Sequence, residues 1–182
     1  MASAISELKV DNGFADGISQ GPLINRKAVD KVLAFIDDAV NKGAQILTGG
    51  VPHTVGENFF EPTILSDISS GARIFNEETF GPVAALMRFR TEAEAVRLAN
   101  DSPFGLAAYF YSRDIGPVFR VAEAIEAGII GINEGLISTE VAPFGGVKMS
   151  GLGREGSKYG VDDYLEIKYL CLDGIEHEHA AI

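Results

Sequence analysis

The chain has 182 residues, of which 46% are hydrophobic and 23% are charged. This composition is typical of a globular protein of about one domain and excludes a disordered or fibrous chain. The 15 basic residues against 26 acidic residues give a net charge of −11. The electrostatic field of so acidic a protein repels phosphate backbones, which excludes nucleic acid as a partner.

Membrane and secretory signals are not expected either. No apolar run approaches the roughly 20 residues that a membrane helix needs. Residues 1–10 carry neither the basic segment nor the apolar segment of a signal peptide. We therefore expect no membrane partner and a cytoplasmic location. The single cysteine, Cys171, excludes an internal disulfide and fits a reducing compartment.

The first strong helical pattern spans residues 25–42, with Asn25 suited to cap its start and Gly43 to end it. Its expected apolar face consists of Val29, Val32, Leu33, Ile36 and Val40. A short strand is expected at residues 44–48, and a second extended segment around residues 59–65.

Short apolar runs then alternate with helical patterns. Thr91 and Glu94 form a capping box, which predicts a helix over residues 92–100 with its apolar side chains facing inward. The other expected elements are strands at 83–89, 107–112 and 128–133, and a helix from Asp114 to about residue 127. Strands that alternate with helices across short joints predict an α/β fold with a mostly parallel, helix-covered sheet.

Periodicity disappears over residues 134–160, where Gly, Ser and Pro dominate. A loop of this length in a compact domain is usually functional or disordered. Residues 164–172 alternate again, which predicts a half-exposed strand. Its two expected faces are Leu165, Ile167, Tyr169 and Cys171 on one side, with Glu166 and Lys168 on the other.

Within the long loop, Gly151, Gly153 and Gly156 have the spacing G-x-G-x-x-G. A dinucleotide-binding turn with this spacing joins a buried strand to a helix whose N-terminus faces the pyrophosphate. Loop residues precede these glycines, and Gly160 interrupts any helix that follows them. The favoured interpretation is therefore a tight loop that uses glycines for its turns.

Two longer stretches are more specific: NEETFGPV at residues 76–83 and APFGGVKMSGLGREGSKYGVDDYLEIKYL at residues 142–170. Together with LKVDNGFADGISQGPLIN from Leu8, they resemble the aldehyde dehydrogenase superfamily over about residues 8–173. NEGLIS before the second stretch makes the chain most similar to succinate-semialdehyde dehydrogenases.

This resemblance implies the α/β fold of the aldehyde dehydrogenase catalytic domain. Residues 1–161 correspond to a part of that domain, residues 162–173 to an oligomerisation strand, and residues 174–182 to a flexible tail. The implied partner is a second copy of the chain through the terminal strand, whose free backbone groups another sheet edge can satisfy. Pairing of this strand within its own sheet is the alternative.

The resemblance also implies a nicotinamide cofactor, NAD or NADP. Glu78 matches a glutamate that accepts hydrogen bonds from the nicotinamide ribose hydroxyls, and Phe80 matches an aromatic residue beside the nicotinamide. The alternatives are a solvated loop acid for Glu78 and a core anchor beneath the loop for Phe80.

For the small-molecule aldehyde substrate, two residues are implied. Phe144 matches a residue that lines the substrate tunnel, and Ser138 matches a serine that donates to the far carboxylate of succinate semialdehyde. A plain core position for Phe144 and ordinary loop capping for Ser138 are the alternatives.

The reaction of this family needs a cysteine thiolate to attack the aldehyde, a glutamate to activate water, and a Rossmann half for the cofactor. In the family these lie N-terminal to the stretch that resembles this chain, so we expect no catalytic residue here and no activity of the chain alone. The residues that distinguish NAD from NADP belong to the same absent half. Cys171 has no matching motif and is interpreted as a structural thiol. The alternative function is a non-catalytic truncated subunit or self-associating fragment.

Other chemistry is weakly indicated. The EHEH stretch at residues 176–179 offers too few ligands for a metal site, so no metal is expected. His53 is an isolated loop histidine without an assigned role. Lys148 and Arg154 suit either a small anion site or, more commonly, structural ion pairs.

Overall fold

The computed structural model describes residues 1–174 and divides the chain into two compact units, Met1–Pro103 and Phe104–Ile182. The sequence pattern does not predict a joint at this point. Its boundaries at residues 161 and 173 stay predictions. Among the described residues, no helix is both long and apolar enough to cross a bilayer.

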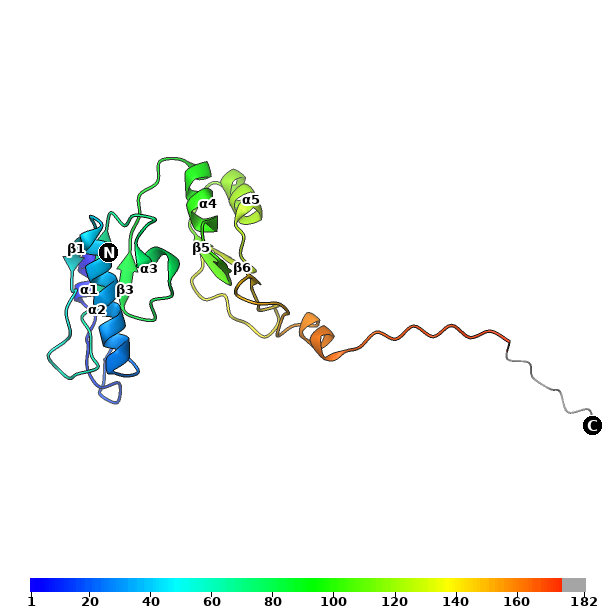
Figure 1. Cartoon of the computed structure of the whole chain (residues 1–182), viewed down its shortest axis with the longest axis horizontal. Helices are drawn as coiled ribbons and strands as arrows, with labels where there is room; N and C mark the ends of the chain where they lie inside the picture. The colour runs from blue at the N-terminus through cyan, green and yellow to red at the C-terminus, as the bar shows by residue number, and fades with distance from the viewer. Residues whose placement is uncertain (175–182) are drawn as a thin grey trace, which may run out of the picture. The chain divides into compact units, whose positions relative to one another are not determined.

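The first unit combines helices with one three-stranded sheet of order β1-β2-β3 (Figure 1). Its elements are α1 (Ala2–Ser6), α2 (Arg26–Asn41), β1 (Gln45–Thr48), β2 (Thr63–Ser66), α3 (Arg73–Asn76), β3 (Val83–Ala85) and α4 (Glu92–Asn100). β1 and β2 are antiparallel, whereas β2 and β3 are parallel.

Helix α2 confirms the first helical prediction. The Asn25 side chain accepts a hydrogen bond from the Ala28 backbone N–H at 3.0 Å, and Gly43 takes a positive φ of 98° just after the helix. The buried face consists of Val29, Val32, Phe35, Ile36 and Ala39. Val40, expected on this face, is instead 41% exposed because it lies at the edge of the apolar stripe.

The core of the first unit forms between α2 and the central strand β2. Phe60, Ile64 and Leu65 are almost completely buried there. The one buried polar residue, Thr63, is satisfied because its hydroxyl donates to the Glu61 carbonyl at 2.7 Å and accepts from the Gly50 N–H at 2.8 Å. This core fixes the surface of α2 on which the candidate site is built.

The second unit contains two small sheets. Its elements are β4 (Phe104–Gly105), β5 (Ala107–Phe110), α5 (Ile115–Ala124), β6 (Ile129–Ile132), β7 (Val147–Lys148) and a 3-10 helix (Tyr159–Tyr164). β5 and β6 are parallel, as expected for two strands joined through a helix, and β4 pairs with β7 antiparallel. The Asp114 side chain caps α5 by accepting from the Gly116 N–H at 2.9 Å.

The prediction of a mostly parallel sheet is therefore only partly confirmed. The chain has an α/β fold, but its described strands form three separate sheets with parallel and antiparallel pairs. The strand expected over residues 83–89 is shorter and only partly buried, since β3 ends at Ala85.

Burial differs strongly between the two units. All the buried hydrophobic side chains of the described residues lie between Val29 and Ile74. In the described part of the second unit, the buried residues are the glycines 105, 131 and 146. Helix α5 of this unit accordingly buries no residue fully. Neither does α4 of the first unit, in which Ala99, expected to face inward, is exposed.

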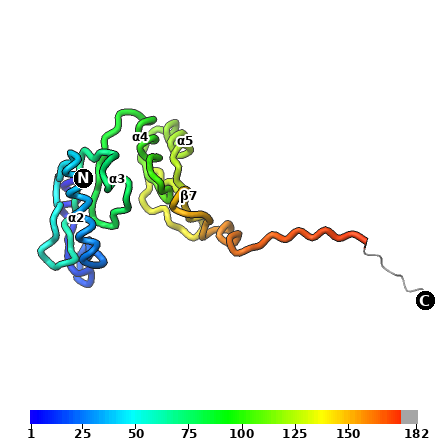
Figure 2. The backbone as a smooth tube through the Cα atoms, viewed as in Figure 1, coloured from blue at the N-terminus to red at the C-terminus, as the bar shows by residue number. Residues whose placement is uncertain are grey.

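The strand predicted over residues 164–172 is not formed within the described chain. Tyr164 ends the 3-10 helix, and residues 165–174 follow as an extended trace without helix or strand (Figure 2). Ile167 of one expected face is fully exposed, and Glu166 and Lys168 of the other face are exposed as well, so both faces meet solvent. A strand needs a partner edge, and none of the described residues supplies one. The oligomerisation strand stays a prediction.

Candidate functional site

The segment that carries Glu78 and Phe80 is a loop between α3 and β3, held at its start by an arginine. The Arg73 guanidinium forms a two-pronged ion pair with the Glu77 carboxylate, with N–O distances of 2.8 and 3.0 Å. The same guanidinium lies 4.8 Å from the centre of the Phe35 ring on α2. Arg73 therefore ties the start of the loop to the helix.

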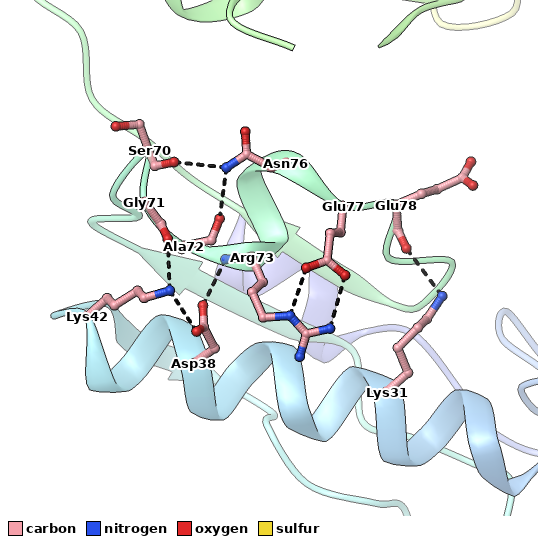
Figure 3. Close-up of polar contacts among 10 residues, drawn as sticks. All are labelled: Lys31, Asp38, Lys42, Ser70, Gly71, Ala72, Arg73, Asn76, Glu77 and Glu78. Carbon is pink, nitrogen blue, oxygen red and sulfur yellow. Dashed lines mark hydrogen bonds and ion pairs between the residues drawn. The ribbon is translucent and has the colours of Figure 1, made fainter. Parts of the chain in front are cut away.

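Two further residues of α2 hold the preceding turn (Figure 3). Asp38 accepts from the Arg73 backbone N–H at 2.8 Å and pairs with the Lys42 ammonium at 2.7 Å. The Lys42 ammonium also donates to the Gly71 carbonyl at 2.8 Å. The start of α3 is thus fastened to one face of α2 by charge-assisted hydrogen bonds.

Glu78 presents its carboxylate to solvent. Its backbone carbonyl accepts a hydrogen bond from the Lys31 ammonium at 3.2 Å, while its side chain points away from this contact (Figure 3). Among the described residues, nothing donates a hydrogen bond to the Glu78 carboxylate or forms an ion pair with it. Both carboxylate oxygens are therefore available to a ligand with two hydroxyl groups.

Phe80 is not a core anchor. Its side chain is 75% exposed, and its backbone has a φ of 44°, in the left-handed region that bulky residues rarely occupy. The next residue, Gly81, packs so closely on α2 that a Cβ there would lie 2.5 Å from a methyl group of Val32. The loop therefore passes directly over the helix and turns the Phe80 ring outward.

Phe80 also lines an open hollow of about 520 Å³ on the first unit. The other lining residues are Pro22, Leu23, Ile24, Lys27, Ala28 and Lys31. The sequence analysis singles out none of these, because the start of α2 has an ordinary amphipathic pattern.

Phe144 belongs to the second unit and is half-buried. It pairs with Glu155 through two backbone hydrogen bonds of 2.8 Å, which places its ring in the wall of a hollow of about 360 Å³. Leu106, Ser150, Leu152, Arg154, Asp163 and Tyr164 also line this hollow. Ser138 does not; it lies exposed in the same unit, and none of the described residues bonds to its hydroxyl.

The glycine spacing belongs to the loop around this second hollow, as expected. Gly151, Gly153 and Gly156 all have positive φ, and they lie between the two-residue strand β7, which is not fully buried, and a 3-10 helix, where a dinucleotide-binding turn would join a buried strand to an α-helix. At Gly153 a Cβ would collide with the Asp163 carboxylate, which accepts from the Arg154 N–H at 3.0 Å. These glycines therefore allow close backbone approach and do not form a dinucleotide-binding turn.

Arg154 and Lys148 have structural partners. The Arg154 guanidinium donates to the carbonyls of Gly146 and Gly153, and the Lys148 ammonium pairs with Glu126. His53, without an apparent partner in the sequence, lies with its Nε2 3.6 Å from a Glu61 carboxylate oxygen. These contacts favour the structural interpretation of Lys148 and Arg154.

Two remaining candidates concern metal binding and thiol chemistry. In the part of the chain that the structure describes, no three His, Cys, Asp or Glu side chains are grouped as metal ligands. The EHEH stretch at residues 176–179 lies outside the described residues. Cys171 is exposed within the extended segment and makes no hydrogen bond or ion pair with any described residue.

The stabilisation that the charged side chains beneath the loop give to the fold depends on pH. The Arg73 backbone N–H, followed by the Lys42 side chain, lowers the pKa of Asp38, and hydrogen bonds from the Arg73 guanidinium lower the pKa of Glu77. A carboxyl pKa that is lower in the folded state stabilises the fold above the unfolded-state value of about 4. This stabilisation is lost as the pH falls through the folded-state pKa.

We therefore expect Asp38→Asn to lower the thermal midpoint at pH 7 and to lower it progressively less as the pH falls below about 4. Thermal melts followed by circular dichroism between pH 7 and pH 3 measure this. Asp37→Asn is the control, because the Asp37 side chain is exposed and forms no hydrogen bond or ion pair with a described residue. Parallel pH profiles for Asp38→Asn and the unmodified chain would contradict the assignment.

The chain is similar to known aldehyde-oxidising enzymes. Residues 1–170 match the sequence model of the aldehyde dehydrogenase family. The chain is 59% identical over 175 residues to glutarate-semialdehyde dehydrogenase of Pseudomonas aeruginosa, and 58% identical over 172 residues to succinate-semialdehyde dehydrogenase (NADP(+)) of Escherichia coli. These matches cover 96% and 94% of this chain and 36% of each relative.

The folds agree as well. The crystal structure of succinate-semialdehyde dehydrogenase from Burkholderia pseudomallei superimposes with a TM-score of 0.91 at 62% identity, over 94% of this chain and 36% of that one. The chain thus spans about a third of the length of the relatives that it matches.

Proposed function

The chain belongs to the aldehyde dehydrogenase family, and on that premise we propose that it supplies part of the active site of an enzyme that oxidises the semialdehyde of a short dicarboxylic acid. Succinate semialdehyde is the substrate proposed first. The names of the two relatives above support this choice, since both describe a semialdehyde with a carboxylate at its far end.

The single observation that carries the proposal is the loop over α2, with an unpaired carboxylate at Glu78 and an exposed ring at Phe80. Two free acceptor oxygens suit the neighbouring hydroxyls of a ribose, and an exposed aromatic ring suits a flat heterocycle. These residues fit NAD or NADP, and Glu78 and Phe80 would hold its nicotinamide riboside portion. The bound cofactor accepts the hydride of the aldehyde.

The second unit contributes to the substrate side in this proposal. Phe144 lines a hollow and would exclude water from the aldehyde. Ser138 has an exposed hydroxyl that could donate a hydrogen bond to the far carboxylate of the substrate. Assembly through residues 162–173 and a cytoplasmic location complete the proposal and depend on the sequence alone.

The test is a chimera in which residues 1–182 replace the matching third of the Escherichia coli relative. We expect this chimera to reduce NADP⁺ with succinate semialdehyde. Glu78→Gln in the chimera should lower kcat/KM for the cofactor by about 10- to 100-fold, because hydrogen bonds to a charged acceptor are replaced by weaker ones. The rate of NADPH formation at 340 nm measures both results.

Glu57→Gln is the matched control, since Glu57 is an exposed acid that bonds to no described residue. It should leave kcat/KM unchanged. A folded but inactive chimera would refute the proposed function, and equal kinetics for Glu78→Gln and Glu57→Gln would refute the role of Glu78.

A further inference from the structure

We propose that Lys31 is a positioning residue for the cofactor-facing part of the loop, where it fixes the backbone of Glu78 and the ring of Phe80. The role in catalysis depends on the function proposed above, whereas the positioning itself is a property of the chain and is tested separately. Lys31 lies on α2, and its contact with Glu78 joins residues 47 positions apart in the sequence.

The Lys31 ammonium contacts three groups. It donates to the Glu78 carbonyl at 3.2 Å, and it lies 5.9 Å from the centre of the Phe80 ring and 5.9 Å from that of the Phe35 ring. Both ring distances are within the range of a cation–π interaction. One side chain therefore connects the helix to both functional residues of the loop.

The choice of acceptor on Glu78 matters for function. A lysine beside a glutamate usually pairs with the carboxylate, which would occupy the oxygens that a ribose needs. Here Lys31 binds the backbone carbonyl instead, and the carboxylate points away from the ammonium (Figure 3). The contact therefore fixes the backbone of Glu78 while its side chain remains free for a ligand.

The conformation of Phe80 gives an independent reason for such a contact. A positive φ at a bulky aromatic residue is unfavourable and persists only where the surroundings enforce it. Exposure of 75% means that burial of the ring does not enforce it. The close packing of Gly81 on Val32 constrains the backbone, and the Lys31 ammonium contacts the ring itself.

The base of Lys31 is rigid enough for this role. Its neighbour Val32 is completely buried, and so is Val29, which lies two positions before Lys31. Phe35, one turn after it, is 1% exposed and also carries the Arg73 guanidinium on its ring. Lys31 thus extends from a helix with five buried residues on its inner face.

The first experiment measures positioning in the 182-residue chain without any ligand. Fluorophenylalanine labelling gives one ¹⁹F resonance for each of the 11 phenylalanines, and the resonance missing in Phe80→Leu assigns Phe80. We expect Lys31→Ala to move this resonance toward its position in the urea-unfolded chain. Lys31→Arg keeps a cation and a donor and should restore it.

Lys9→Ala is the control, because it removes the same charge from an exposed side chain that bonds to no described residue. The Phe60 resonance reports whether the core stays folded. A Phe80 resonance that is unchanged in Lys31→Ala, or that moves equally in Lys9→Ala, would overturn the proposal.

The second experiment uses the chimera described above. When only a fraction of the molecules holds the loop in the binding conformation, the apparent affinity is the intrinsic affinity multiplied by that fraction. We therefore expect Lys31→Ala to raise KM for NADP⁺ on the order of tenfold with a smaller change in kcat, and Lys31→Arg to restore most of it. A loss of kcat alone would contradict positioning. An inactive chimera would refute the proposed function and leave the ¹⁹F result to decide the role of Lys31.

Discussion

Purified residues 1–182, incubated with succinate semialdehyde and either NAD⁺ or NADP⁺, should form no NADH or NADPH. Oxidation through a covalent thiohemiacetal needs an activated thiolate held against the aldehyde. The one cysteine, Cys171, is exposed in an extended segment and has no partner among the described residues that could orient or activate it. Absorbance at 340 nm measures the result at high protein concentration.

The active chimera is the positive control for this assay, and Cys171→Ser of the 182-residue chain is the matched variant. Both the chain and Cys171→Ser should give the rate of buffer alone. Turnover that is present in the chain and lost in Cys171→Ser would show that Cys171 is a nucleophile, and our account of the site would then be wrong.

The largest effect on stability is expected at Phe60. This residue is completely buried beside α2 and β2, so Phe60→Ala removes a ring from the core and leaves a cavity. Such changes lower the free energy of unfolding by about 3–5 kcal/mol. Urea denaturation followed by far-UV circular dichroism measures the change.

Phe14→Ala is the control for Phe60→Ala, because the Phe14 side chain is 100% exposed. Its effect should stay within about 0.5 kcal/mol. Similar losses for the two variants would mean that the core of the first unit is not where the structure places it.

Elements defined by local signals were predicted well. α4 spans Glu92–Asn100 as expected, because Thr91 accepts from the Glu94 N–H and fixes the first turn from within the sequence itself. α2 is equally local, with Asn25 at its start and Gly43 at its end. Capping involves residues three or four positions apart, and a sequence pattern contains all of that information.

Sheet pairing was predicted less well, because it depends on which distant backbone edges meet. β1 lies antiparallel to β2, and β4 pairs with β7 more than 40 positions along the chain, as in the register of Phe104 with Lys148. An alternating or apolar run predicts an extended segment without naming its partner. The same reason explains residues 165–172, where the pattern is present and no described edge pairs with it.

In the candidate site too, local motifs were predicted and contacts between distant residues were not. The short motif around Glu78 and Phe80 predicted which residues to examine, and whether they bind a cofactor stays a prediction. Lys31 was missed because a lysine on an amphipathic helix is indistinguishable from an ordinary solvated position. Its contacts with Glu78 and Phe80 exist only after the loop folds over α2. No periodicity encodes a contact of that kind.

Among the described residues, the buried hydrophobic side chains are confined to residues 29–74, which has a consequence for how such a protein can change over evolutionary time. The side chains around Phe144 are not part of this core, so exchanging them changes the shape of the hollow that they line at little cost to the free energy of global unfolding. Under the function proposed above, selection could change the preferred length of the aldehyde through residues of one unit, while the other unit keeps the core beneath the loop that carries Glu78 and Phe80.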